Sequence, residues 1–118
     1  MRLECVLIKK YDKLVRDRIP EIIRKAGEIP TFRILNDKEF FAALRAKIPE
    51  EAEELLSASS SKEIVNEIVD LLELLDEIMA QMGISKLEIC TLRRSKNKKR
   101  GAFKNKIFLE KTETKPRV

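Results

Sequence analysis

Residues 50–70 read EEAEELLSASSSKEIVNEIVD, and this stretch decides both the fold and the candidate site. It holds two acidic clusters with the patterns E-E-x-x-E and E-x-x-D, separated by twelve residues rich in serine. Acids three residues apart lie on the same side of a helix, and a short turn makes successive helices antiparallel neighbours. Four converging carboxylates repel one another unless a cation lies between them. The spacing therefore predicts two adjacent helices and a site for Mg²⁺ or Mn²⁺, which carboxylate oxygens favour.

Three helix starts carry the same signature, a capping side chain followed three positions later by glutamate. The capping residues are Asn36, Ser60 and Ser85. The helices expected from these starts, together with a shorter one before them, cover residues 20–25, 38–58, 62–81 and 86–100. Pro49 cannot donate a backbone hydrogen bond, so we expect the first of the two long helices to kink or restart there.

The fold class that follows is mainly α, a helical bundle whose core is formed by the two long helices. Residues 31–35 and 107–109 are candidates for a small pair of short β-strands, paired with each other or with residues 3–8. A chain of 118 residues predicts one domain. We place that domain at residues 1–111, followed by a flexible tail over residues 112–118.

Composition excludes several classes of chemistry. The chain has no histidine, which rules out a Ser-His-Asp or Cys-His nucleophilic site and a histidine-ligated zinc. It has no glycine-rich phosphate loop of the P-loop or dinucleotide type. No apolar run reaches the ~20 residues that span a membrane, and the start lacks the pattern of a secretory signal. Cys5 and Cys90 give no metal or disulfide spacing, so we expect a cytoplasmic protein.

The apolar residues of the two long helices predict which acids face the core, at about 100° per residue. The stripe on the first helix is Phe41, Leu44, Ile48, Ala52 and Leu55. The stripe on the second is Ile64, Ile68, Leu71, Leu72, Leu75, Met79 and Met82, with Leu74 outside it. Glu51, Glu54 and Glu67 border these stripes. Asp70 lies farther out, and Glu53 points away. The second stripe is too wide for one partner helix, so we predict a homodimer or higher homo-oligomer with the site near the subunit interface.

Other interpretations of the charges stay open. A glutamate-rich helix is most often a solvated face, although these acids border apolar stripes and have few local cations to neutralise them. Residues 93–106, RRSKNKKRGAFKNK, carry eight basic residues and no acid. They fit a nucleic-acid-binding module with steeply salt-dependent binding. A non-catalytic helical interaction protein is the third alternative.

Three segments of the chain resemble a known family. E-E-x-x-E followed on the next helix by E-x-x-D is similar to the all-α NTP pyrophosphatase superfamily, the MazG-like proteins. Residues 11–23, YDKLVRDRIPEII, and the K-x-x-x-R-G-x-F of residues 96–103 resemble one branch of it. That branch holds phosphoribosyl-ATP pyrophosphohydrolase-like and house-cleaning nucleotide pyrophosphatases. The matches run from about Tyr11 to Leu109, and one departure is Ala102, where a second glycine is common.

The resemblance implies Mg²⁺-dependent hydrolysis of a nucleoside triphosphate at the α–β phosphoanhydride, giving the monophosphate and pyrophosphate. It implies house-cleaning of non-standard nucleotides as the purpose. The metal ligands that it implies are Glu51, Glu54, Glu67 and Asp70. Glu50 matches the leading acid of the pattern and is expected to orient a ligand or a water, so Glu50 and Glu51 are the catalytic candidates.

The residue types agree with such a reaction. A triphosphate is an anion and cannot approach four carboxylates unless a cation reverses the repulsion, and basic residues must offset the charge on the leaving pyrophosphate. The substrate-binding candidates are Lys96, Lys99 and Arg100, with Lys13 and Arg16 as further ones. An ion pair with Asp17 or Glu21 is an equal alternative for Lys13 and Arg16. We expect neither nucleic acid nor a membrane as a partner.

Overall fold

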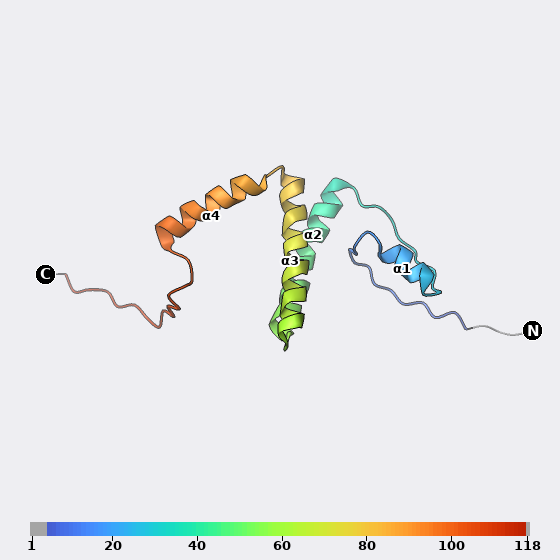
Figure 1. The fold of residues 1–118 in the computed structure, drawn as a ribbon, viewed down its shortest axis with the longest axis horizontal. Coiled ribbons are helices and arrows are strands. Elements are labelled where there is room, and N and C mark those ends of the chain that lie inside the picture. The colour runs from blue at the N-terminus through green and yellow to red at the C-terminus, as the bar shows by residue number, and fades with distance from the viewer. Residues whose placement is uncertain (1–4, 118) are drawn as a thin grey trace, which may run out of the picture. The chain divides into compact units, whose positions relative to one another are not determined.

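The computed structural model describes residues 5–117, and statements about structure refer to that part of the chain. It contains four helices, α1 (Ile19–Lys25), α2 (Asp37–Ser57), α3 (Ser61–Met82) and α4 (Lys86–Arg100) (Figure 1). Residues 5–117 include no β-strand, so the mainly α fold class is confirmed. No helix in this range is both long and apolar enough to cross a membrane.

The short strands expected at residues 31–35 and 107–109 are wrong, because both segments lack regular secondary structure. Their β-branched and aromatic residues fit a strand locally. A strand forms, however, only where a neighbouring segment takes up its backbone N–H and C=O groups. The third candidate, residues 3–8, gives no strand over residues 5–8. Residues 3 and 4 lie outside the described residues.

The chain divides into two compact units, the first ending at Gly83 and the second beginning at Ile84. Helices α1, α2 and α3 belong to the first unit, and α4 belongs to the second. The assignment of residues 1–111 to a single domain stays a prediction, as does the flexibility of the tail.

The capping side chains form where the sequence predicts them. Asn36 Oδ1 accepts the backbone N–H of Glu39 at 2.8 Å, and the Glu39 carboxylate accepts the N–H of Asn36 at 3.4 Å, which completes a capping box. The hydroxyls that begin the next two helices, Ser60 Oγ and Ser85 Oγ, accept backbone N–H groups at 3.2 and 3.1 Å. Helix α3 ends at Gly83, whose φ of 69° is a left-handed conformation that favours glycine.

Helix α2 runs through Pro49 without a break, so of the two expected outcomes the restart is wrong and the kink stays a prediction. Proline removes one backbone hydrogen bond, but the turns on both sides keep theirs. Lys47 confirms that the helical register is intact across the proline. Its Nζ lies 3.7 Å from Glu50 Oε1 and 3.4 Å from Glu51 Oε1, at spacings of three and four residues.

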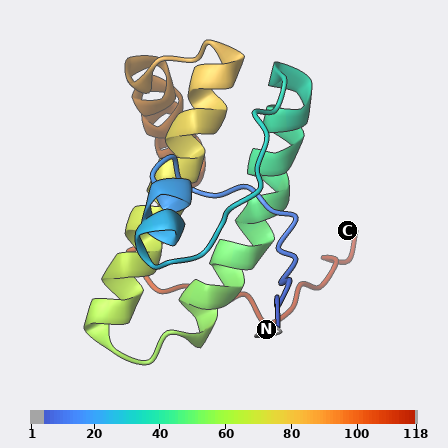
Figure 2. The same ribbon diagram turned by 90° about the vertical axis from the view of Figure 1, so that its right-hand side faces the viewer.

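Helices α2 and α3 lie side by side and form a helical hairpin (Figure 2). Among the described residues, the buried ones are Leu44 of α2, Leu74 of α3 and the acid Glu51. Leu44 was expected in the core, whereas Leu74 was expected outside it and Ala52, expected inside, is exposed. The face that α3 turns toward α2 is therefore rotated from the predicted stripe toward Leu74 and its acidic neighbours.

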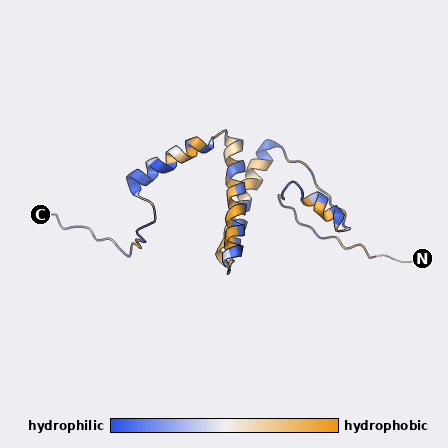
Figure 3. Cartoon of the chain, in the orientation of Figure 1, coloured by the Kyte–Doolittle hydropathy of each residue, from blue (hydrophilic) through white to orange (hydrophobic). Residues whose placement is uncertain are grey.

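The described residues include several apolar side chains of α3 that are exposed, and Figure 3 shows in orange the hydrophobic residues along this helix. Its exposed apolar residues are Ile64, Val65, Ile68, Val69, Leu72, Leu75 and Met82, with 39 to 58% of each accessible. At about 100° per residue they fall in one arc of roughly 140°. We call this arc the outer face of α3. The predicted stripe exists, but it does not form the seam with α2.

Candidate metal centre

Four carboxylates converge between the last turns of α2 and the first half of α3. One oxygen from each of the four acids lies within 4.8 Å of the others, and the acids are Glu51, Glu54, Glu67 and Asp70. Two come from α2 and two from α3, and the two acids of each pair are three residues apart. Each pair lies on one face because a helix returns to the same face after three or four residues. We call these four residues the acidic cluster. Their role as metal ligands stays a prediction.

Two oxygens of the acidic cluster are buried without a hydrogen bond when all four acids are ionised. They are Glu51 Oε2 and Glu67 Oε2, for which the described part of the chain supplies no donor. Glu51 as a residue is only 7% exposed. Buried carboxylate oxygens are costly unless something positive or a donor contacts them. The cluster thus presents oxygen atoms that a hard cation such as Mg²⁺ or Mn²⁺ can satisfy.

The mutual repulsion of the cluster appears in the pKa of Glu54. Hydrogen bonding to Glu51 raises this pKa from 4.5 to about 7, and removal from water and hydrogen bonding to Glu67 add to the rise. A carboxyl group beside two ionised carboxylates keeps its proton because that proton separates like charges. Near neutral pH the cluster therefore holds a proton that a bound cation would displace.

Three basic side chains contact the acidic cluster or its neighbour Glu50. Lys47 bridges Glu50 and Glu51 along α2. Arg16 Nη2 donates to Asp70 Oδ1 at 2.6 Å, and Lys13 Nζ lies 3.6 Å from Glu50 Oε1. The alternative that Lys13 and Arg16 pair with Asp17 or Glu21 is wrong in this structure. Instead, Glu21 pairs with two other cations, Arg18 and Lys25.

Sequence reasoning missed the role of Lys47 and the partners of Arg16. Lys47 had a usable signal, since a lysine four residues before a glutamate on a helix lies beside it. Arg16 had none, because 54 residues separate it from Asp70.

Glu50 and Glu53 differ from the cluster in position. Glu50 lies next to Lys13 and Lys47 with its side chain 41% exposed, at the edge of the cluster. Glu53 is exposed and is not among the four converging acids, as expected for a residue that points away.

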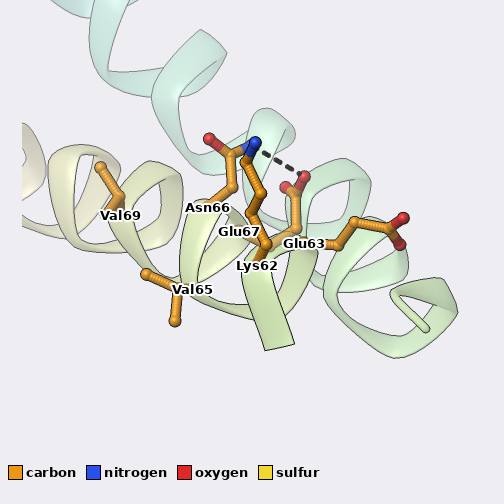
Figure 4. Close-up of a pocket in the computed structure, with 6 residues that line it drawn as sticks. All are labelled: Lys62, Glu63, Val65, Asn66, Glu67 and Val69. Carbon is orange, nitrogen blue, oxygen red and sulfur yellow. Dashed lines mark hydrogen bonds between the residues drawn. The ribbon is translucent and has the colours of Figure 1, made fainter. Parts of the chain in front are cut away.

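A surface hollow on the first turns of α3 adjoins one member of the cluster (Figure 4). Its lining residues are Lys62, Glu63, Val65, Asn66, Glu67 and Val69. Asn66 Nδ2 donates to Glu67 Oε1 at 3.4 Å, the dashed line in the figure. Glu67 thus has one oxygen held by an amide and the other buried without a donor.

The basic candidates Lys96, Lys99 and Arg100 lie in the last turns of α4, where all three are exposed. Basic residues near a helix C-terminus complement its dipole, so these positions also stabilise the helix. A second hollow is lined by the stretch from Arg100 to Ile107. Since α4 belongs to the second unit, contact of these residues with a substrate at the cluster stays a prediction.

Comparison with known proteins identifies the family. The family model described as phosphoribosyl-ATP pyrophosphohydrolase matches residues 10–97. An uncharacterized protein of Mycolicibacterium smegmatis is 54% identical over 48 residues, which are 41% of this chain and 49% of that protein. The chain thus spans about half the length of this relative. No solved structure matches. The chain belongs to the phosphoribosyl-ATP pyrophosphohydrolase family of the MazG-like all-α NTP pyrophosphatase superfamily, and the resemblance is confirmed.

Proposed function

We propose that this member of the phosphoribosyl-ATP pyrophosphohydrolase family is a Mg²⁺-dependent nucleoside triphosphate pyrophosphohydrolase. It cleaves the α–β phosphoanhydride, releases a nucleoside monophosphate and pyrophosphate, and removes non-standard nucleotides from the cytoplasm. The observation that carries the proposal is the convergence of four carboxylates within 4.8 Å, two oxygens of which are buried without a donor. Family membership supplies the reaction class.

The residues present fit a divalent cation. Glu51, Glu54, Glu67 and Asp70 would hold it, because they offer only hard oxygen donors and their charges repel one another without it. Mn²⁺ is the alternative to Mg²⁺ because it accepts the same donors. When bound, the cation supplies Lewis-acid chemistry, polarising a phosphate oxygen and making water acidic enough to attack at neutral pH.

Side chains at the edge of the cluster accept the proton and orient the attacking water. Glu50 is accessible to solvent and can accept a proton from an attacking water, while Lys47 keeps it beside Glu51. Glu51 is buried and held in place by the same lysine, so it serves as ligand and as the residue that orients the water. Because the chain has no histidine, we assign the role of general base to these carboxylates.

Basic residues offset the charge that develops on the leaving pyrophosphate. Lys96, Lys99 and Arg100 are candidates from α4, where Gly101 follows with a φ of 79° and no side chain to obstruct a phosphate. Lys13 and Arg16 are candidates that already lie at the cluster.

The reaction is tested by incubating the protein with a panel of nucleotides and identifying the products with and without Mg²⁺ or Mn²⁺. The panel includes phosphoribosyl-ATP, dUTP, dCTP, and oxidised and deaminated triphosphates. We expect equimolar monophosphate and pyrophosphate from at least one member, only with the cation. Glu51→Gln and Asp70→Asn should abolish turnover while Glu53→Gln retains it. Turnover by either of the first two variants at the wild-type rate would refute the ligand assignment.

We also propose that the outer face of α3 is covered by a second copy of the chain. The described residues include only two buried hydrophobic side chains, while α3 exposes seven apolar ones on one arc. A contiguous apolar patch of this kind marks an interface, and in a homodimer two outer faces can pack on each other through the same surface. Leu72→Glu should convert the oligomer to monomer in sedimentation velocity. A wild-type protein that sediments as a monomer at micromolar concentration would refute the interface.

A further inference from the structure

The segment before α1 reaches both helices of the metal centre with cationic side chains. Lys13 contacts Glu50 of α2, and Arg16 contacts Asp70 of α3. The segment carries no regular secondary structure at these positions, and Asp12 before them has a positive φ of 46°. Two side chains only three positions apart in this segment thus reach acids that belong to different helices. We call Lys13 and Arg16 the cationic arm.

The position of Arg16 is set by the acidic cluster rather than by its sequence neighbours. Its hydrogen bond to Asp70 raises the pKa of the guanidinium, and the charges of Glu73 and Glu51 act in the same direction. Arg18, two residues later, does not contact the acidic cluster. It lies 3.9 Å from Glu21, and 87% of its side chain is exposed. Two arginines two residues apart therefore have different environments, and only the first lies at a cluster oxygen.

Arg16 occupies a carboxylate that a cation would need. A guanidinium and a divalent cation on the same aspartate carry like charges, so each weakens the binding of the other. The Arg16 side chain is 56% exposed and has room to leave Asp70. The fork of an arginine fits phosphate as well as it fits carboxylate. A substrate phosphate arriving with the cation thus offers a second partner to the same side chain.

We propose, on the basis of the proposed function, that Arg16 is a substrate-positioning residue that exchanges partners. It neutralises Asp70 while the acidic cluster holds no cation, and it transfers to a phosphate of the substrate when the cation binds. Lys13 assists by remaining at Glu50, which keeps the cationic arm beside the cluster during the exchange. The arm therefore competes with the free cation but cooperates with the cation and phosphate together.

The test compares two ligands in the full-length protein. Mn²⁺ alone is titrated by electron paramagnetic resonance, and inorganic tripolyphosphate is titrated by calorimetry in saturating Mg²⁺. For Arg16→Gln we expect Mn²⁺ to bind about 2- to 5-fold more tightly, the size of an exposed ion pair that no longer competes. Tripolyphosphate should bind about 10-fold more weakly, the loss of one charge-assisted hydrogen bond. Arg18→Gln is the matched control and should change neither affinity.

A purely structural role of Arg16 would not produce tighter Mn²⁺ binding together with weaker tripolyphosphate binding. Circular dichroism must show wild-type helicity for each variant, and Arg16→Lys, which keeps the charge without the fork, should restore Mn²⁺ affinity to the wild-type value but not tripolyphosphate affinity. Unchanged or weaker Mn²⁺ binding by Arg16→Gln would overturn the proposed exchange while leaving the proposed function intact. Failure of the wild-type protein to bind Mn²⁺ at all would instead overturn the metal centre, and the exchange with it.

Discussion

Replacing Glu67 by glutamine should stabilise the cation-free protein and remove its response to Mg²⁺. The ion pairs at the centre involve Glu50, Glu51 and Asp70, so this substitution removes a charge without breaking one of them. Glu67 Oε2 is buried without a donor. Glutamine has the same shape, can still accept from Asn66, and gains N–H groups that can donate to a neighbouring carboxylate.

The size of the effect follows from the pKa of Glu54, which rises from 4.5 to about 7. At about 1.36 kcal/mol per pKa unit, this rise corresponds to roughly 3 kcal/mol of unfavourable interaction with the ionised form. Glu54 is exposed, so solvent screening reduces that figure, and Glu67 is one of two carboxylates responsible. We therefore expect a gain of about 1 kcal/mol in the free energy of unfolding. For a domain of this size that is about 4 °C in Tm.

The assay is thermal unfolding followed by circular dichroism at pH 8, above the pKa of Glu54, first in EDTA and then in MgCl₂. The wild type should gain stability with Mg²⁺, because a ligand that binds only the folded state stabilises it. Glu67→Gln should start higher and gain little. Glu53→Gln removes an exposed acid from the same hairpin and should behave as the wild type. The reasoning is refuted if Glu67→Gln melts below the wild type in EDTA, or if it keeps the full gain with Mg²⁺.

Three further outcomes are expected. Because the pKa of Glu54 is raised to about 7, the folded state binds a proton that the unfolded state releases near 4.5. The ionisation of Glu54 thus lowers the free energy of unfolding as pH rises from about 4.5 to about 7. Urea unfolding over this pH range should show the decrease, and Glu54→Gln should remove it. An unchanged dependence on pH in the variant would contradict the assignment. Pro49→Ala should raise stability by up to ~3 kcal/mol in urea unfolding, since it restores a helical hydrogen bond, and should leave the Mg²⁺ response unchanged; a loss of that response would show that the proline shapes the centre. Gly83→Ala should cost about 1 kcal/mol because the residue has a φ of 69°, and an unchanged urea midpoint would count against this conformation.

The sequence was sufficient where the cause of a structure is local. Capping at Asn36, Ser60 and Ser85 depends on a side chain three residues from its partner, and all three helix starts agree within one residue. The convergence of acids follows the same logic, because spacing of three fixes one face and the serine-rich turn brings the faces together. Capping, acid spacing and turn length were thus enough to predict the two helices and the convergence of their acids.

The orientation of α3 could not be predicted, because it depends on contacts between distant segments. The hydropathy pattern favours burying Ile64, Ile68 and Leu75, yet these residues are 39 to 47% exposed. Burial of Leu74 and approach of Arg16 to Asp70 select the other side. Periodicity identifies the most apolar face of a helix but not whether the same chain or a second copy covers it. The predicted and the observed orientation of α3 about its axis leave different surfaces of the helix for a partner.

The orientation of α3 links the stability of the hairpin to its proposed function. A hairpin that turns its acids inward and its apolar face outward has little core of its own, with two buried hydrophobic residues among those described. Three devices offset the repulsion of the acidic cluster in the cation-free chain: the proton on Glu54, the Lys47 bridge and the Arg16 contact. The proton and the Arg16 contact occupy positions that the cation would take over. Cation binding should therefore release a proton from Glu54 and the Arg16 side chain from Asp70 together, and part of its binding free energy becomes folding free energy. A second copy on the outer face of α3 would supply the rest, so that the centre and the oligomer stabilise each other.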